Sequence, residues 1–507
     1  MAADQPTIIG LLARAFAARP DAIALIAGDT SLTYAEYAAS VAALAALLPD
    51  VRARPVATLL RNGLAACVAP FAIQAAGGIA ATLNPDYTEA ELAPMLADAA
   101  PAALICEADL ADKARAALAP ASDTCLIVLP EKPCAMFDGL PIGPLPPAPA
   151  PASLAVLQFT GGTTGRPKGV LLTHRAVATN VAQREARLPT IHGDERILCI
   201  MPLFHSFAAA MCLHLAANCA GTLIILPRYR PDWVVDAIEE HAITRLPAGP
   251  TVFNSLLAYE GLDPARLASL RCAYSGSAPL SAETLARWEA RTGVPIYEGF
   301  GQSEAGPVLT YHGPATRLKT GSCGPALDAT ELAVVDPATG RHLPTGASGE
   351  IVARGPQIMA GYLGQPEATA VTLRDGWLHT GDIGRLDENG YLFVEDRLKD
   401  MAIVGGYNVY PREVDEVLMR CPQVIEAGAV GVPDAYRGEV IWAFVAGRDP
   451  EPDAIAAHCA ANLVKYKWPS MIHVLAELPK TSAGKIDKVA LKTMAREIAA
   501  EEIAHVA

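Results

Sequence analysis

One segment of the sequence combines residue types that suit the binding of a polyphosphate. It spans residues 159–170 and reads FTGGTTGRPKGV. Glycines allow backbone conformations that other residues avoid, and backbone N–H groups, hydroxyls and an ammonium group can all contact phosphate oxygens. A plain turn between two strands is the alternative. The candidate phosphate contacts are Thr160, Gly161, Gly162, Thr163, Thr164 and Lys168.

The spacing of this segment differs from that of the common P-loop. A P-loop reads GxxxxGK[ST] and opens a helix. Here Pro167 precedes the lysine, and the apolar run 169–172 continues as an expected strand. We therefore predict a phosphate loop of another type.

Six further segments carry glycine, hydroxyl, carboxylate or lysine groups at short spacing. They are MPLFHSF (201–207), YSGSAPL (274–280), YEGFGQSE (297–304), WLHTGDIG (377–384), DRLKDMAIVGGYNVYPREVD (396–415) and PKTSAGKIDK (479–488). In this order the segments resemble those of the adenylate-forming superfamily, and they look most like bacterial fatty-acid CoA ligases. The resemblance implies that a carboxylate attacks the α-phosphate of ATP and releases pyrophosphate. The acyl-adenylate would then react with a thiol, and no protein nucleophile is required.

The resemblance assigns the adenylation step to Lys485, Glu304 and His205. The Lys485 ammonium would neutralise the carboxylate and the α-phosphate together, as a mobile point charge. Glu304 would hold Mg²⁺, a cation that keeps several waters and needs few protein carboxylates. His205 would position the substrate without transferring a proton. The alternatives are a solvated lysine, a surface glutamate and a structural histidine.

The resemblance also implies the contacts to the nucleoside. Asp382 suits the ribose hydroxyls because a carboxylate accepts two hydrogen bonds, and Arg397 would add a donor; an ordinary surface pair is the alternative. Phe300 would offer a stacking face to adenine. His379 replaces the arginine of many family members and touches no assigned contact. The remaining predicted ATP or AMP contacts are Ser277, Ala278, Glu298, Gly299, Gly301 and Ser303, of which Ser303 stands where the family usually has threonine.

Three of the matching segments would form the pocket for the acid. No lysine or arginine falls within residues 205–211, 274–278 or 300–308, so a second carboxylate on the substrate would lack a partner. We therefore expect a medium- to long-chain fatty acid, with an aryl acid of the benzoate or coumarate type as the alternative. The predicted pocket residues are His205, Phe207, Met211, Tyr274, Gly276, Pro307 and Val308.

The expected acceptor is free CoA, because the given sequence ends shortly after Lys485 and leaves no room for a fused carrier domain. Gly405 and Gly406 would let pantetheine approach the backbone, with a plain β-turn as the alternative. Lys399 matches the hinge of the family. Arg437, Lys465 or Lys467 could meet the CoA nucleotide. A separate carrier protein, a luciferase-like oxygenase and a nucleotide-binding scaffold without turnover remain alternatives.

The segments must be positioned by more than one domain. Up to about residue 330, strand-like runs alternate with Ala-rich helical stretches, which predicts layered α/β subdomains with largely parallel sheets. Short strands separated by turns follow and predict a β-rich subdomain. A smaller α+β unit comes last. We predict an α/β fold with a large AMP-binding domain over 1–396, a hinge over 397–400 and a small mobile C-terminal domain over 401–507.

Composition limits the classes of protein. The 507 residues are too many for one ordinary domain, and the net charge of −14 excludes an overall basic footprint for nucleic acid. Eleven cysteines without a CxxC pair, and an N-terminus without a basic segment, predict a cytoplasmic protein. The uncharged runs 62–84 and 205–227 are rich in Ala and Gly and predict core pieces, not membrane spans. The expected partners are small molecules, and a homodimer is left open.

Overall fold

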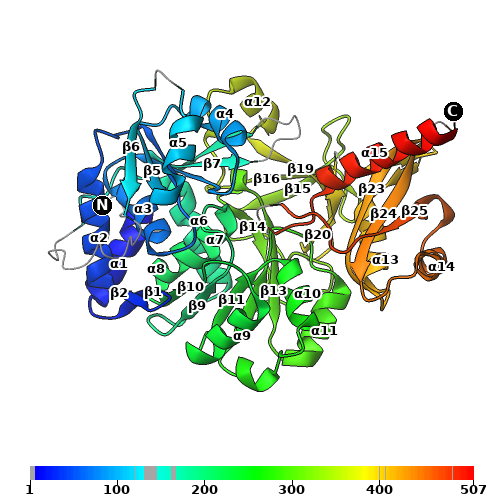
Figure 1. The fold of residues 1–507 in the computed structure, drawn as a ribbon, viewed down its shortest axis with the longest axis horizontal. Coiled ribbons are helices and arrows are strands. Elements are labelled where there is room, and N and C mark those ends of the chain that lie inside the picture. The colour runs from blue at the N-terminus through cyan, green and yellow to red at the C-terminus, as the bar shows by residue number, and fades with distance from the viewer. Residues whose placement is uncertain are drawn as a thin grey trace.

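Four sheets organise the chain in the computed structural model. It describes residues 6–119, 122–130, 145–160, 167–398, 400–405, 407–434, 436–481 and 484–506. Figure 1 shows a large body built from the N-terminal two thirds and more of the chain, and a smaller body at its right. The predicted α/β fold with a large and a small domain is confirmed.

The first large sheet carries the predicted phosphate loop at one end of a hairpin. Its strand order is β17-β8-β7-β4-β3-β5-β6. Strands β3 to β7 pair in parallel, whereas β8 runs antiparallel to β7 and β17 antiparallel to β8. The strands are β3 (Pro55–Leu59), β4 (Ile79–Leu83), β5 (Ala103–Glu107), β6 (Cys125–Leu129), β7 (Leu154–Thr160), β8 (Lys168–Thr173) and β17 (Gly361–Tyr362). The connecting helices are α3 (Leu64–Ala75), α4 (Glu89–Ala99), Ala108–Leu110 (3-10), α5 (Ala111–Ala117) and α6 (His174–Arg187).

The second large sheet has the order β14-β13-β12-β11-β9-β10-β1-β2 and is parallel from β1 to β13. Its strands are β1 (Ile23–Ala27), β2 (Thr30–Thr33), β9 (Arg196–Cys199), β10 (Thr222–Ile225), β11 (Arg245–Ala248), β12 (Cys272–Ser275), β13 (Ile296–Gly301) and β14 (Val308–Tyr311). The helices are α1 (Ile8–Ala18), α2 (Tyr34–Leu47), α7 (Ser206–Ala208), the π-helix Ala209–His214, α8 (Leu215–Cys219), α9 (Pro231–Glu240), α10 (Pro250–Ala258), Pro264–Leu267 (3-10), α11 (Ala282–Thr292) and Ser303–Ala305 (3-10).

The third sheet is the predicted β-rich subdomain. It has the order β15-β16-β19-β18, with β20 also paired to β19. Its elements are β15 (Glu331–Val335), β16 (Gly349–Arg354), α12 (Pro366–Thr372), β18 (Leu373–Arg374), β19 (Trp377–Leu386) and β20 (Leu392–Arg397). The short strands separated by turns that the sequence predicts here are therefore present.

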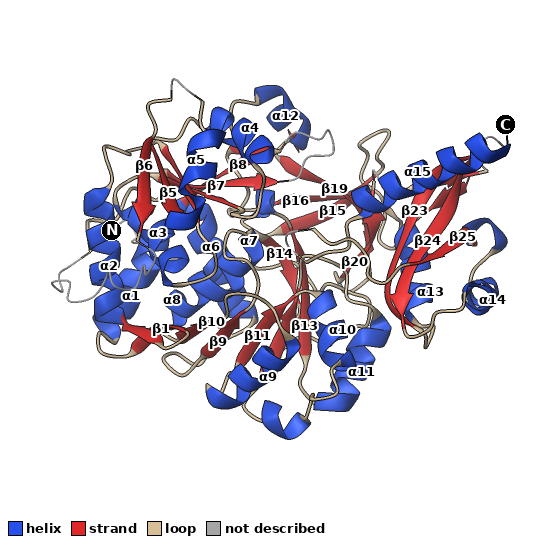
Figure 2. Ribbon diagram, viewed as in Figure 1, coloured by secondary structure: helices blue, strands red, loops and turns tan. Residues whose placement is uncertain are grey.

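The small domain has its own sheet, of order β22-β21-β24-β23, with β25 pairing to β24. Figure 2 shows helix α15 lying along this sheet. The elements are β21 (Ala402–Val404), β22 (Tyr407–Val409), α13 (Pro411–Met419), β23 (Val424–Asp434), β24 (Gly438–Gly447), α14 (Pro452–Asn462), Lys465–Lys467 (3-10), β25 (Pro469–Val474) and α15 (Lys488–Val506). Strand β20 ends at Arg397 and β21 begins at Ala402, so the chain passes between the sheets over 398–401.

Local sequence explains where several elements begin. Thr33 and Thr88 each form a capping box with the glutamate three residues on, and this starts α2 and α4. The uncharged run 62–84 folds as α3 and β4, whose apolar side chains are buried in the core of the large domain. Among the described residues, no helix combines the length and apolarity that crossing a membrane would need.

Candidate active site

The predicted catalytic lysine sits on a tight turn of the small domain. An isolated bridge joins Lys480 to Ile486, and the backbone N–H groups of Thr481 and Gly484 close the turn between them with 2.8 Å hydrogen bonds. The Thr251 hydroxyl at the start of α10 donates to the Gly484 carbonyl at 2.8 Å. This contact holds the turn against the large domain.

The docked turn brings Lys485 to residues of the large domain. Its ammonium lies within electrostatic reach of Asp382, Arg397 and His205. Burial and the Arg397 charge lower the pKa of Lys485 to about 8, and the Asp382 carboxylate opposes this shift. The lysine is therefore positioned as a cation that can lose its proton near neutral pH.

Asp382 and Arg397 face each other across neighbouring strands. They are register partners in β19 and β20, and Arg397 Nε lies 3.4 Å from Asp382 Oδ1. Burial raises the pKa of Asp382 to about 6, against the opposing effect of Arg397. The Arg397 side chain is 55% exposed, so part of its guanidinium remains accessible to a ligand. The predicted ribose pair is thus brought together.

His379 contributes indirectly to the same segment. Its Nδ1 lies 2.8 Å from Glu350 Oε2, and the other Glu350 oxygen accepts from the Gly381 N–H at 3.2 Å. The expectation that His379 touches no assigned contact holds for direct contact alone, because Glu350 links it to the turn before Asp382.

Glu304 lies at the end of a chain of contacts that starts at the phosphate hairpin. The Tyr362 hydroxyl donates to Glu304 Oε1 at 2.8 Å, and Lys168 Nζ lies 5.0 Å from the centre of the Tyr362 ring. Thr160 pairs with Lys168 at the ends of β7 and β8. Among the described residues no group of three or more His, Cys, Asp or Glu side chains could hold a metal alone. A single carboxylate fits Mg²⁺ that takes its other ligands from phosphate and water.

His205 forms the cap of α7. Its Nδ1 accepts a hydrogen bond from the Phe207 N–H at 3.2 Å, which leaves the ring proton on Nε2. Burial and the Lys485 charge lower the pKa of His205 to about 3, so the ring is neutral at physiological pH. Next to it, the Ser206 hydroxyl lies 3.3 Å from that of Ser303. A neutral donor here suits substrate positioning.

Strand β13 supplies the predicted adenine segment. Glu298 is buried, which raises its pKa to about 7, and Phe300 is half-buried. A Cβ at Gly299 would overlap the Tyr311 ring, and one at Gly301 would overlap the Pro307 carbonyl. Packing between β13 and β14 therefore requires both glycines. Across from them, Ser277 adopts a left-handed conformation with φ of 71°, and Ala278 follows it at half-burial.

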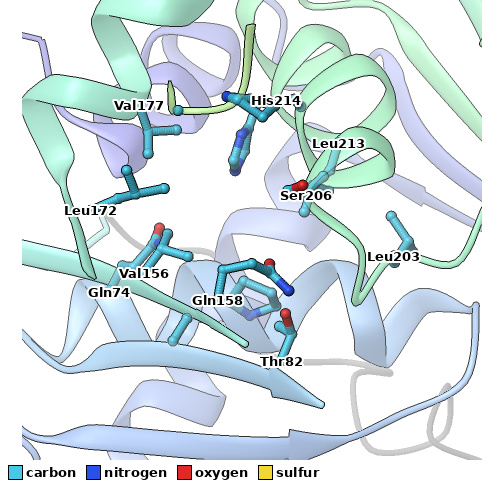
Figure 3. Close-up of a pocket in the computed structure, with 16 residues that line it drawn as sticks. Gln74, Thr82, Val156, Gln158, Leu172, Val177, Leu203, Ser206, Leu213 and His214 are labelled. Atoms are coloured by element: carbon cyan, nitrogen blue, oxygen red, sulfur yellow. The ribbon is translucent and has the colours of Figure 1, made fainter. Parts of the chain in front are cut away.

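A cavity opens beside Ser206 between the first sheet and the helix that follows His205 (Figure 3). Strands β4, β7 and β8 form one wall, α3 and α6 close it, and the stripe Ser206, Ala209, Ala210 and Leu213 forms another. Pro307 also lines it. Lining side chains are mostly apolar, and none of them is charged.

The other predicted pocket residues do not line this cavity. Phe207 packs on Gly276, where a Cβ would come within 2.6 Å of the ring. Tyr274 is buried and accepts a hydrogen bond from Arg245. The Val308 backbone bonds to the buried Asn180 side chain.

Met211 contacts a basic residue that lies outside the three segments predicted to form the acid pocket. Arg184 of α6 donates to the Ala210 carbonyl at 2.9 Å and contacts Met211 Sδ at 3.2 Å. The predicted segments contain no basic residue, but a helix about 20 residues earlier in the chain brings one to them.

Several predictions lie outside the described residues: Gly161, Gly162, Thr163, Thr164, Lys399 and Gly406. Gly405 begins the turn between β21 and β22, with φ of 58°, and its N–H donates to the Arg437 carbonyl at 2.8 Å. Lys467 pairs with Glu413, and Lys465 starts a short 3-10 helix. These contacts stay within the small domain.

Sequence reasoning missed several residues of the site. Tyr362 and Thr251 lie outside the motifs that the sequence analysis identified. Each forms a hydrogen bond with a residue that is distant in the sequence and is brought close by the fold. Gln74, Gln158 and His214 also line the cavity, and none of the three lies within a predicted motif. In the sequence these residues are recognisable only as polar residues within apolar segments, and that pattern does not predict what they contact.

Comparisons with known proteins agree with this geometry. Residues 12–363 match the AMP-binding enzyme family, and residues 413–485 match the AMP-binding enzyme C-terminal domain. The long-chain-fatty-acid–CoA ligase of Bacillus subtilis (strain 168) is 34% identical over an alignment of 520 positions, which covers 95% of this chain and 93% of the relative. The feruloyl-CoA synthase of Amycolatopsis sp is 37% identical over 478 residues, covering 92% and 95%.

A solved structure shares the fold over nearly the whole chain. ATP-bound MatB from Rhodopseudomonas palustris is 30% identical, covers 97% of this chain and 99% of its own, and superposes with a TM-score of 0.89. The apo form of MatB superposes with a TM-score of 0.79, so the chain fits the ATP-bound form more closely than the apo form. This chain belongs to the AMP-binding enzyme family, in the acyl-CoA synthetase branch of the adenylate-forming superfamily.

Proposed function

We propose that the protein is an ATP-dependent carboxylic acid–CoA ligase. A carboxylate oxygen of the acid attacks the α-phosphorus of ATP, and pyrophosphate leaves. The sulfur of CoA then attacks the acyl carbon, and AMP leaves with the bonding electrons. The observation that carries the proposal is the convergence of Lys485, Asp382, Arg397 and His205 where the small domain meets the large one.

The adenylation step depends on positioning and on neutralising charge. Lys485 would contact both the acid carboxylate and the α-phosphate, so that its ammonium offsets the charge that gathers there. Asp382 and Arg397 would hold the ribose. Glu304, fixed by Tyr362, would hold Mg²⁺, and the cation would supply further charge neutralisation. Thr160 and Lys168 would contact the phosphate chain.

The acid is proposed to be hydrophobic. The cavity beside Ser206 has no charged lining, so an apolar tail can enter it without leaving a charge unpaired. A medium- to long-chain fatty acid fits this lining and the similarity to the Bacillus subtilis enzyme. An aryl acid is the second candidate, because the relative that acts as a feruloyl-CoA synthase is similar over nearly the whole chain.

The thiol step is proposed to need a second orientation of the small domain. Rotation about residues 398–401, which include the predicted hinge Lys399, would withdraw Lys485 and turn the Gly405–Gly406 face toward the adenylate. The predicted division into 1–396, 397–400 and 401–507 belongs to this proposal. A cytoplasmic location is also proposed, since the cysteines of the described residues are free thiols.

The test measures AMP, pyrophosphate and acyl-CoA formed from ATP, Mg²⁺ and straight-chain or aromatic acids, with and without CoA. We expect acyl-CoA and AMP in equal amounts, and loss of both with Lys485→Ala. Pyrophosphate release without any acyl-CoA would favour a separate carrier protein as the acceptor. Oxygen uptake with light emission would favour an oxygenase, and ATP binding without turnover a scaffold.

A further inference from the structure

Two polar atoms in the cavity beside Ser206 have no hydrogen-bond partner among the described residues: Gln74 Oε1 and His214 Nδ1. Gln74 is 1% exposed and His214 is 6% exposed. A buried polar atom without a hydrogen-bond partner lowers the stability of the protein by roughly 1–3 kcal/mol. Two such atoms in one mostly apolar cavity therefore destabilise the protein unless a ligand supplies partners. Figure 3 shows the His214 ring pointing into the cavity, with Gln74 on another wall.

The two residues enter the cavity from different elements. Ser206, which contacts Ser303, marks the end next to the predicted nucleotide site. His214 closes the helical stretch of α7 and the π-helix that begins at Ser206, and Gln74 comes from α3. An acid whose carboxylate sits near His205 would place its tail in the cavity that both residues line.

The unpartnered atoms define the chemistry of the tail. Gln74 Oε1 can only accept a hydrogen bond, whereas His214 Nδ1 donates when it carries the ring proton. Burial and the charge of Arg184 lower the pKa of His214 to about 3, so its ring is neutral. A hydroxyl both donates and accepts, so its chemistry suits either atom. A carboxylate offers Gln74 no donor.

We propose that Gln74 and His214 form a hydroxyl-binding pair in the acid pocket, so that the preferred acids carry a hydroxyl on the tail. This inference rests on the proposed ligase function, and it adds a group that selects among hydrophobic acids. Arg184 is the nearest alternative anchor, because its Nε and Nη2 also lack partners among the described residues. It bonds to the Ala210 carbonyl and does not line the cavity.

The test compares acids that differ by one hydroxyl. The pairs are 8-hydroxyoctanoate with octanoate and 4-hydroxycinnamate with cinnamate, and octanedioate serves as the charged-tail comparison. The readout is kcat/KM for acid-dependent pyrophosphate release. In at least one pair we expect the hydroxylated acid to be preferred at least about tenfold, which is the contribution of one or two hydrogen bonds. We also expect octanedioate to be poorer than 8-hydroxyoctanoate.

The double variant Gln74→Met, His214→Phe keeps similar side-chain volumes and removes both hydrogen-bonding atoms. The preference ratio should fall toward one in this variant, whereas Leu213→Met, a change in the same lining without a hydrogen-bonding group, should leave the ratio as it is. A ratio near one in the wild-type protein, or a ratio that survives the double variant, would overturn the proposal. So would a preference for octanedioate, which would point to Arg184.

A binding measurement separates this proposal from the ligase function. If no acid supports pyrophosphate release, the proposed function fails, and calorimetric titration of the same acids still tests the pair. Tighter binding of the hydroxylated acid that disappears in the double variant would support the hydroxyl site. Equal binding of both members of each pair would overturn it.

Discussion

Lys485 combines two properties that rarely occur together, a flexible cationic side chain and a desolvated position. Burial disfavours its charge, and Arg397 adds repulsion, so the ammonium loses its proton more readily than an ordinary lysine. The pKa of Asp382 shifts upward, because burial disfavours its ionised carboxylate. In the proposed adenylation step, Lys485 acts in its protonated form and Asp382 in its ionised form.

The pH dependence of adenylation should therefore be bell-shaped. For kcat/KM of ATP, activity should fall as pH rises through about 8, where Lys485 loses its proton, and fall as pH drops through about 6, where Asp382 gains one. Pyrophosphate release at saturating acid measures this profile. Lys485→Arg should abolish the alkaline limb, because a guanidinium stays protonated, and Asp382→Asn should abolish the acid limb. Limbs that persist in both variants would contradict these assignments.

Tyr362 should matter through its hydroxyl. Tyr362→Phe keeps a ring beneath Lys168 and removes the donor to Glu304. A hydrogen bond to a charged group contributes roughly 1.5–3 kcal/mol, so we expect KM for MgATP to rise about tenfold or more. Tyr362→Leu, which also removes the ring, should be worse. An unchanged KM in Tyr362→Phe would show that Glu304 does not need this partner.

The residue types of the site could be predicted from the sequence, but their contacts could not. Lys485, Asp382 and Arg397 stand in recognisable segments. Tyr362 and Thr251 stand in segments without such a signal, and each bonds to a residue that is far away in the chain. Long-range contacts of this kind depend on sheet register and domain docking, which a single sequence does not specify.

Among the elements, strand β13 is constrained by its glycines. Gly301→Ala would drive a Cβ into the Pro307 carbonyl, a backbone group that cannot rotate away. Gly293→Ala is the matched control, since Gly293 ends α11 with φ of 69° and a Cβ there would meet nothing within 4 Å. We expect Gly293→Ala to cost about 1–2 kcal/mol from backbone strain and Gly301→Ala to cost clearly more. Thermal unfolding midpoints of the two variants would check this, and a larger loss in Gly293→Ala would contradict it.

The smaller α+β unit that the sequence predicts at the end of the chain is present. Its helix α13 spans Pro411–Met419 and buries Val414, Val417 and Leu418 on one face. The π-helix Ala209–His214 was not foreseen. Its sequence is equally compatible with an α-helix, so the choice depends on tertiary packing, which includes contacts with β9 of the second sheet. His214 at the end of this helix lines the cavity.

At the scale of the whole molecule, the small domain is held in the arrangement that presents Lys485. The Thr251–Gly484 hydrogen bond and the Lys492–Asp400 ion pair at 2.8 Å secure the turn and the terminal helix. Acceptance of CoA would require this arrangement to change. The two half-reactions should therefore respond differently to a bond that fixes the domains.

A disulfide between Thr251→Cys and Gly484→Cys should fix them. A Cβ at Gly484 would lie 3.8 Å from Thr251 Oγ1, so the two side chains at these positions would face each other across the domain contact. The oxidised double variant should release pyrophosphate but form little acyl-CoA, and reduction should restore it. Each single variant under the same oxidant is the control. Normal acyl-CoA formation by the cross-linked protein would contradict a rotation between the steps.

The most direct test of the central claim follows oxygen from the acid into the nucleotide. The protein is incubated with ATP, Mg²⁺, CoA and an acid labelled with ¹⁸O at both carboxylate oxygens. The masses of AMP, pyrophosphate and inorganic phosphate are then determined by mass spectrometry. Attack of the carboxylate on the α-phosphorus predicts one ¹⁸O atom in each AMP and none in pyrophosphate. Label in inorganic phosphate, or AMP without label, would contradict an acyl-adenylate and with it the proposed reaction.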